Sequence, residues 1–313
     1  TAEARFLRGL RYFNAVRLWG KVPVVLTEIT PQQAKTLSRD DVAAVYAAIE
    51  ADFGFAAQNL PTSVAGKEGR ATSGAAKAFL GKVYLTQQKW SDATKVLNEV
   101  VQSKTYDLVP DVQDVFKLDN ELNEEILFAI RFSTATDLGH FGFGTPTYTA
   151  LSALYDAADT RLALLAPVGS GDPDSTYPTK QHDGSSGEKG RDFPVLRYSD
   201  VLLMLAEAQN ETAYQASGDA FKHLNALRSR AGLAALTSTA VTNQDEFRTA
   251  VLKDRRLELA LESHRWFDLL RTNEAANALS GAGIKAHQLL YPIPQNEINV
   301  YNDASKFPQN PGY

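Results

Sequence analysis

Residues 254–271 contain a dense group of titratable side chains. Glu258 and Glu262 lie four residues apart, and His264 and several arginines are close to them in sequence. General acid–base catalysis would need such groups in a cleft that perturbs their pKa values. Opposite charges at three- and four-residue spacing on a helix more commonly form ion pairs that support the fold. We therefore predict a structural role for this segment and no catalytic residue in it.

Residue types that bind metal ions or phosphate groups are sparse in this chain. It has no cysteine, and its five histidines show no H-x-x-x-H spacing, so zinc is not expected. The glycine-rich stretches 139–145 and 184–190 lack the spacing of a P-loop. The acidic turns at 172–174 and 183–184 supply too few ligands for an EF-type calcium loop. We predict no cofactor and no metal site.

Composition and charge exclude further classes of function. The net charge is −5, from 37 acidic and 32 basic residues, which argues against a nucleic-acid partner. No apolar run approaches the roughly 18–20 residues that cross a bilayer. A glycoside hydrolase would need two carboxylates about 5–9.5 Å apart in a cleft. The loop acids Asp172, Asp174 and Asp183 give no sign of such a pair, so we predict that the protein is not an enzyme.

The stretch 136–195 is predicted to carry the ligand site. It is rich in Gly, Asp, Ser, Thr and Pro, and Val168–Asp192 has almost no core-forming residues. Structureless loops of this length in a compact domain are usually functional or disordered. Aromatic rings on such loops can stack on sugar rings, and carboxylates or amides can bond sugar hydroxyls. The predicted ligand-binding residues are Phe141, Phe143, Tyr177, Gln181, Asp172 and Asp183. The neighbouring Tyr148 and Tyr155 are predicted to pack in the core.

The elements that must position these loops are mainly helices. Apolar periodicity predicts helical segments at 3–19, 39–59, 72–104, 147–157, 198–230 and 245–271. Two of them, 72–104 and 198–230, have a central break and form hairpins of two helices. Gly81 and Leu97 in the first hairpin resemble a tetratricopeptide pattern, in which small residues allow close helix approach. Alternation at 125–132 predicts one short strand, so the expected fold is all-α with minor β-structure.

The last 27 residues have a distinctive pattern of prolines and turn residues. Pro292 and Pro294 fix φ and remove backbone donors, which predicts an extended tail rather than a helix. The tail contains L-x-P-I-P-x-x-E-I at 290–298 and ends in QNPGY at 309–313. This combination resembles the C-terminus of the SusD/RagB family.

Further segments resemble the same family in the same order. They are the opening A-E-A-R-F-L-R helix, R-Y-S-D-V-L-L-M-L-A-E-A at 197–208, and R-R-x-E-L at 255–259. The resemblance implies one mainly helical domain spanning 1–313. Within it we expect tetratricopeptide-like hairpins in 1–105, a loop-rich segment with a short strand in 106–196, and family helices with an extended tail in 197–313.

The resemblance also implies a function and a location. Members of the family are surface lipoproteins of Bacteroidota-type bacteria that bind glycans or other nutrients beside a TonB-dependent transporter. For this chain it implies non-catalytic binding of an oligosaccharide or other nutrient, and a SusC-like transporter as partner. It implies contact with the outer membrane only through an N-terminal lipid anchor. Because the first residues already have helical rhythm, we expect a trimmed chain without signal peptide or anchor cysteine.

A second class of function is compatible with the predicted hairpins. A tetratricopeptide-like stack could serve as a protein–protein interaction scaffold without a small ligand of its own. A pocket lined by loop aromatics would favour nutrient capture. A bare loop face beside a broad apolar groove would favour the scaffold.

Overall fold

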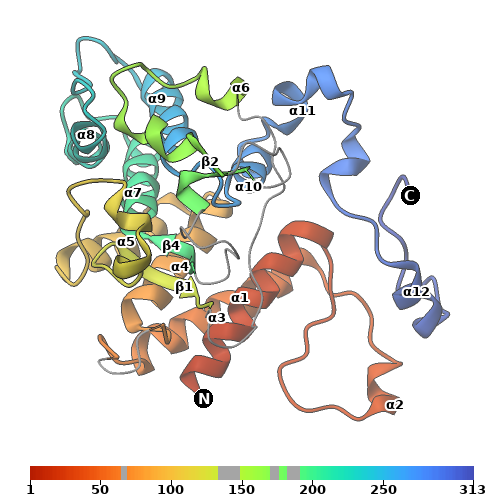
Figure 1. The fold of residues 1–313 in the computed structure, drawn as a ribbon. Helices are drawn as coiled ribbons and strands as arrows, with labels where there is room; N and C mark the ends of the chain where they lie inside the picture. Colours follow the sequence, from red (N-terminus) through yellow and green to blue (C-terminus); the bar gives the residue numbers. More distant parts are fainter. Residues whose placement is uncertain (65–68, 133–148, 170–175, 182–190) are drawn as a thin grey trace. The chain divides into compact units, whose positions relative to one another are not determined.

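The structure, a computed structural model, describes residues 1–64, 69–132, 149–169, 176–181 and 191–313. They form two compact units, the first made of Thr1–Leu60 and His264–Tyr313 and the second of Pro61–Ser263 (Figure 1). The protein is 56% helix and 5% strand, which confirms the predicted all-α fold. No helix within the described ranges is long and apolar enough to cross a bilayer.

The first unit contains two long helices and several short ones. Its helices are α1 (Ala2–Trp19), α2 (Pro31–Ala34), α3 (Val42–Asn59), α10 (Arg265–Arg271), α11 (Ala275–Ala278) and α12 (Gln295–Tyr301), with 3-10 turns at Ser280–Ala282 and Ala286–Leu289. The long helices α1 and α3 pack along each other. Phe6 and Phe53 are fully buried between them and meet edge to face at a centroid distance of 5.6 Å. Arg8 donates bonds of 2.7 and 2.8 Å to the carboxylate of Asp52, which links the two helices.

The C-terminal tail is fixed to the end of α1 by the residues of its own motif. Tyr291 N donates to Leu18 O at 2.7 Å, and Asn310 Nδ2 donates to Trp19 O at 3.1 Å. Gln309 bonds both backbone groups of Ile293, at 2.7 and 2.9 Å. The two halves of the tail motif therefore hold each other, which gives the motif a structural role. The expectation of a tail without helix was wrong for α12, which starts directly after Pro294, because proline is well tolerated at a helix start.

The second unit contains the predicted helical hairpins. Its helices are α4 (Ser73–Thr86), α5 (Trp90–Gln102), α6 (Thr149–Ser152), α7 (Tyr198–Thr212), α8 (Asp219–Arg230) and α9 (Gln244–Glu258), with 3-10 turns at Asp114–Phe116, Leu118–Asn120, Thr160–Leu165 and Thr179–Gln181. α4 pairs with α5, and α7 pairs with α8, as predicted. A Cβ atom placed on Gly81 would lie 2.5 Å from Cγ of Leu97. Glycine is therefore what allows α4 and α5 to approach so closely.

The described part of the second unit contains four short strands, where the sequence predicted one. β1 (Ile126–Ile130) is the predicted strand, and it pairs antiparallel with β4 (Phe193–Arg197). A second antiparallel ribbon joins β2 (Pro167–Gly169) to β3 (Thr176–Pro178). The last three strands were missed because they are three to five residues long and each of them includes a proline.

The predicted helix 245–271 is interrupted. α9 ends at Glu258 and α10 starts at Arg265, while Leu261 and Ser263 between them have φ values of 64° and 62°. Lys180 Nζ donates to the backbone carbonyls of Glu258 at 3.1 Å and Ala260 at 2.8 Å, and Arg197 Nη2 also donates to Glu258 O at 3.1 Å. The helix ends here because a distant cation satisfies its last carbonyl groups, which the local sequence does not reveal.

Candidate ligand-binding site

Most of the predicted ligand-binding side chains lie outside the described residues. These are Phe141, Phe143, Asp172 and Asp183. Tyr177 is described through its backbone in β3, and Gln181 through its backbone in the turn Thr179–Gln181. The assignment of these six residues therefore stays a prediction.

Of the two tyrosines predicted to pack in the core, Tyr155 lies within the described residues. Tyr155 is buried, and its hydroxyl donates to Leu257 O at 2.7 Å. Its predicted packing role is confirmed. Tyr148 lies outside the described part of the chain.

The described residues that flank the predicted loops are tied to one another. The backbone N–H of Phe132, just before segment 133–148, donates to Asp192 Oδ1 at 2.9 Å, just after segment 182–190. Arg191 Nη1 donates to the carbonyls of Thr179 and Lys180, both at 3.2 Å. Gly169 pairs with Thr176 across segment 170–175. The ends of these loop segments are therefore fixed to the second unit.

Lys180 is the deepest of these anchors. Its ammonium group is buried, donates to Glu262 Oε1 at 2.6 Å and lies 4.7 Å from the ring centre of Phe116. Burial lowers the pKa of Lys180, and the nearby charge of Arg197 lowers it further, although Glu262 acts in the opposite direction. The loop segment thus has a core residue at its base, although Val168–Asp192 was predicted to have almost none. A lysine in a polar stretch gives no sequence signal of burial.

Below the loop bases, Arg197 lies at the centre of a buried ion-pair network. Its side chain is fully buried and bonds the carboxylates of Glu125, Glu258 and Glu262. Arg230 reaches Glu125 and Glu258 at 2.5 Å each. The network joins the start of β1, the end of β4, α8 and the end of α9. It therefore fixes the strands and helices from which the loops leave.

Arg161 extends this network toward the 3-10 turn Thr160–Leu165. Its guanidinium group pairs with Asp159 at 2.7 Å, Asp254 at 3.1 Å and Glu258 at 3.4 Å. Arg228 contacts the other oxygen of Asp254 at 2.9 Å. Asp254 and Glu258 lie 93 and 97 positions from Arg161 in sequence, so local reasoning could not identify these two contacts.

The prediction of a structural ion-pair network around Glu258 is confirmed, but its expected partners were wrong. Local pairs along one helix were expected, whereas the cations at Glu258 come from Arg161, Arg197 and Arg230 in other elements. A further pair joins α7 to α9, because Arg255 contacts Asp200 at 2.5 Å. Lys82 reaches the same carboxylate at 2.8 Å.

The electrostatics of Glu258 follow from this arrangement. Burial would raise the pKa of its carboxyl group, but the positive charges of Arg230, Arg197 and Arg161 outweigh burial and lower it. The carboxylate stays ionised and engaged by guanidinium groups, so it does not offer a free acid or base to a substrate. Within the described residues, no group of His, Asp and Glu is arranged to hold a metal ion.

Two carboxylates closer to the loops behave differently. Burial raises the pKa of both Glu121 and Asp192. Glu121 Oε1 accepts a bond of 2.5 Å from the backbone N–H of Asp192, and Arg131 pairs with Asp192. These contacts give the loop bases a second, smaller polar anchor.

Several solved structures share the fold of this chain, and all of them are SusD-like proteins. The chain aligns over its full length with 78% of a laminarin-binding SusD-like protein, with a TM-score of 0.82 and 28% sequence identity. It also aligns over its full length with 78% of a SusD superfamily protein from Parabacteroides distasonis, with a TM-score of 0.83 and 27% identity. The protein thus has the helical SusD-like fold.

Comparison of the sequence with family models and with known relatives leads to the same family. The family model described as the SusD family matches residues 175–289, and one described as starch-binding associating with outer membrane matches residues 1–85. SusD-like protein P2 of Formosa agariphila is 26% identical over 375 residues, covering 100% of this chain and 74% of that protein. The starch-binding protein SusD of Bacteroides thetaiotaomicron is 31% identical over 132 residues, covering 39% and 22%. The chain belongs to the SusD/RagB family, and the description of the family model matched at residues 1–85 points to association with the outer membrane.

Proposed function

We propose that this protein binds an oligosaccharide or other nutrient at the bacterial outer-membrane surface and delivers it to a SusC-like TonB-dependent transporter. The observation that carries the proposal is the full-length likeness to a laminarin-binding SusD-like protein at 28% identity. The relationship to the starch-binding protein SusD supports the same ligand class. A lipid anchor N-terminal to the helix α1 would hold the protein at the membrane.

The proposal assigns ligand capture to the loops of the second unit. Asp192, Arg191 and Lys180 hold the described residues at the ends of these segments in place. Preorganisation of this kind reduces the entropy that a binding loop loses when it meets its ligand. Phe141, Phe143 and Tyr177 are assigned as stacking residues, and the hydrogen-bonding residues are Gln181, Asp172 and Asp183.

Binding without cleavage is part of the proposal. Hydrolysis of a glycosidic bond needs two carboxyl groups with separate acid and base or nucleophile roles. The closely spaced Glu258 and Glu262 are each bound by Arg197, and both are buried. Transport needs capture followed by release, so modest affinity at the transporter mouth suits the task.

The loop assignment is tested by removing its aromatic rings. In the full chain, Phe141→Ala, Phe143→Ala and Tyr177→Ala are made singly and together, and binding to laminarin, starch and other soluble glycans is measured by calorimetry. Each stacking ring should contribute about 0.5–3 kcal/mol to binding, and the melting temperature should not change. Tyr291→Ala is the control, because its half-exposed ring lies in the first unit. Unchanged affinity in the triple variant for a glycan that the parent protein binds would place the site elsewhere.

Delivery is tested separately, in cells that produce the anchored protein. We expect a TonB-dependent transporter to co-purify with it, and the triple loop variant to retain that partner while it loses glycan. A protein that retains protein partners but binds no glycan would favour the interaction-scaffold alternative.

A further inference from the structure

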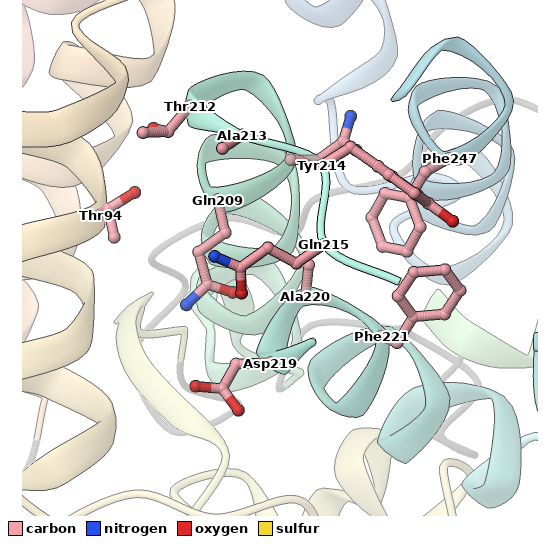
Figure 2. A pocket seen from close by; sticks show the side chains of 11 residues that line it. Thr94, Gln209, Thr212, Ala213, Tyr214, Gln215, Asp219, Ala220, Phe221 and Phe247 are labelled. Atoms are coloured by element: carbon pink, nitrogen blue, oxygen red, sulfur yellow. The ribbon is translucent and has the colours of Figure 1, made fainter. Parts of the chain in front are cut away.

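A pocket of about 280 Å³ lies in the second unit (Figure 2), and none of its lining residues belongs to the loop bases. It opens where α7 turns into α8, and α5 and α9 complete its walls. One side is aromatic, with Tyr214 and Phe221 edge to face at 6.1 Å and Phe221 and Phe247 at 4.7 Å. Thr94, Gln209 and Gln215 form a polar side (Figure 2). The volume is near the lower end of the roughly 300–1,000 Å³ of small-molecule sites.

Three oxygen atoms in the walls of this pocket are buried without a partner. They are Thr94 Oγ1, Gln209 Oε1 and Asn210 Oδ1, and no donor in the described part of the chain reaches them. Buried polar atoms are nearly always paired in native proteins, since an unpaired acceptor loses its hydration without replacement. A bound water or a ligand could supply the missing donors, and because these atoms have almost no accessible surface, side chains of the wall must shift for a ligand to reach them.

Other polar groups beside this pocket are paired. Tyr214 Oη donates to Val241 O at 2.7 Å, and Gln244 Nε2 donates to Asn210 O at 2.7 Å. Asn210 Nδ2 donates to Gln244 O at 3.1 Å, which fixes the orientation of its amide and leaves Oδ1 as an acceptor. Gln209 Oε1 has no donor among the described residues, so this lining side chain keeps an acceptor for a ligand.

The charged residues in the pocket lining limit the chemical class of ligand that the pocket can bind. The described lining contains neither lysine nor arginine, so a phosphate or carboxylate group would enter without a counter-charge. The only carboxylate in the lining, Asp219, is paired with Lys222 at 2.7 Å. An aromatic wall, amide groups and hydroxyl acceptors suit a neutral ligand with several hydroxyl donors.

We propose that this pocket is a second binding site, for a single neutral sugar unit whose hydroxyls bond Thr94, Gln209 and Asn210 beside the ring of Tyr214. The choice of a sugar among neutral polyols rests on the proposed function. The site lies on the helical hairpins and uses none of the residues assigned to the loops. A glycan captured by the loops and a sugar unit in this pocket would therefore bind independently.

The test observes the two amide side chains directly. The full chain, labelled with ¹⁵N, is titrated with glucose, galactose, mannose and xylose, and the side-chain NH₂ resonances of Gln209 and Asn210 are followed. At least one sugar should shift both pairs of resonances saturably. Gln209→Met and Thr94→Val keep side-chain size, and each should weaken that sugar about tenfold, as expected for one lost hydrogen bond of ordinary net strength. Gln102→Met, an exposed change at the end of α5, should leave binding unchanged.

The outcomes separate this proposal from the proposed function. No shift with any of the four sugars, or a response to methylammonium but to no sugar, overturns the pocket assignment. If the Phe141, Phe143 and Tyr177 triple variant loses glycan binding while the pocket resonances still respond to sugar, both proposals hold. If the loops bind glycan and the pocket stays silent, the pocket proposal alone fails. If the pocket responds but loop changes do not affect glycan binding, the loop assignment alone fails.

Discussion

Glu258 is the residue on which the scaffold of the second unit depends most. It is buried and receives cations from three other elements, through Arg161, Arg197 and Arg230. A buried ion pair is weak evidence of net stabilisation, because both charges lose their hydration. Its removal is costly all the same, since the opposite charges remain buried. The network therefore specifies which elements meet more than it adds to total stability.

Removing the charge of Glu258 should destabilise the protein without changing ligand contacts. Glu258→Gln keeps the side-chain shape but leaves three guanidinium groups under-compensated, at a cost of about 3–5 kcal/mol in the free energy of unfolding. Urea unfolding measures this loss. The control is Glu99→Gln, which breaks a partly exposed pair with Lys77 and should cost less than about 1 kcal/mol. Normal stability together with lost glycan binding in Glu258→Gln would instead assign this residue to the ligand site.

Acid should remove the contribution of Glu258. Its pKa in the folded protein is lowered from an ordinary value of 4.5, so the unfolded chain binds the proton more tightly. The stabilisation is therefore complete well above pH 4.5 and declines as the pH falls below that value toward the folded pKa. The stability difference between the parent protein and Glu258→Gln should shrink steadily in acid. A difference that is constant down to the acid limit of folding would contradict this account.

At the level of elements, periodicity predicted the helices well and their ends less well. Apolar spacing was sufficient for α1, α3 and the two hairpins, because one buried face determines each of them. The break after α9 depends on Lys180, which is 78 residues away from Glu258 in sequence. The strand β4 depends on pairing with β1 across a long insertion. Contacts of this range leave no local pattern in the sequence.

The same limit applies to the candidate sites. Glycine and polar composition pointed to the loop segments, but the anchors at their bases, Arg191 and Asp192, have no distinctive spacing. The pocket beside Gln209 was not predicted, since its walls come from four helices and one connection. Only the fold brings Thr94 near Asn210. Residues of the tail motif were recognised from sequence, and the structure gives them contacts with α1 rather than with a ligand.

Because α4 packs closely on α5, replacing a glycine by alanine at this contact should have the opposite effect on stability to the same change in α3. Gly81→Ala places a methyl group 2.5 Å from Leu97 side-chain atoms, so the helices must separate, at a cost of about 1–3 kcal/mol. Gly54→Ala in α3 meets no atom within 4 Å and should stabilise by up to about 1 kcal/mol through helix propensity. Thermal or urea unfolding of the two variants should give shifts of opposite sign. Equal stabilisation by both would show that α4 and α5 are not in close contact.

For the molecule as a whole, the fold and the family agree on a scaffold built for binding. The helical second unit holds the ends of the predicted loops in fixed positions, and its buried carboxylates are engaged in ion pairs with its own arginines. Fold alone does not determine function, because one architecture can serve several tasks. The central claim is therefore that this chain captures a glycan and leaves it intact.

One measurement tests that claim most directly: calorimetric titration of the full chain with laminarin, starch and a panel of other soluble glycans, with reducing ends assayed in the same samples. We predict saturable binding of at least one glycan, unchanged by a metal chelator, and no increase in reducing ends. Binding of no glycan, or the release of reducing ends by the pure protein, would contradict the account.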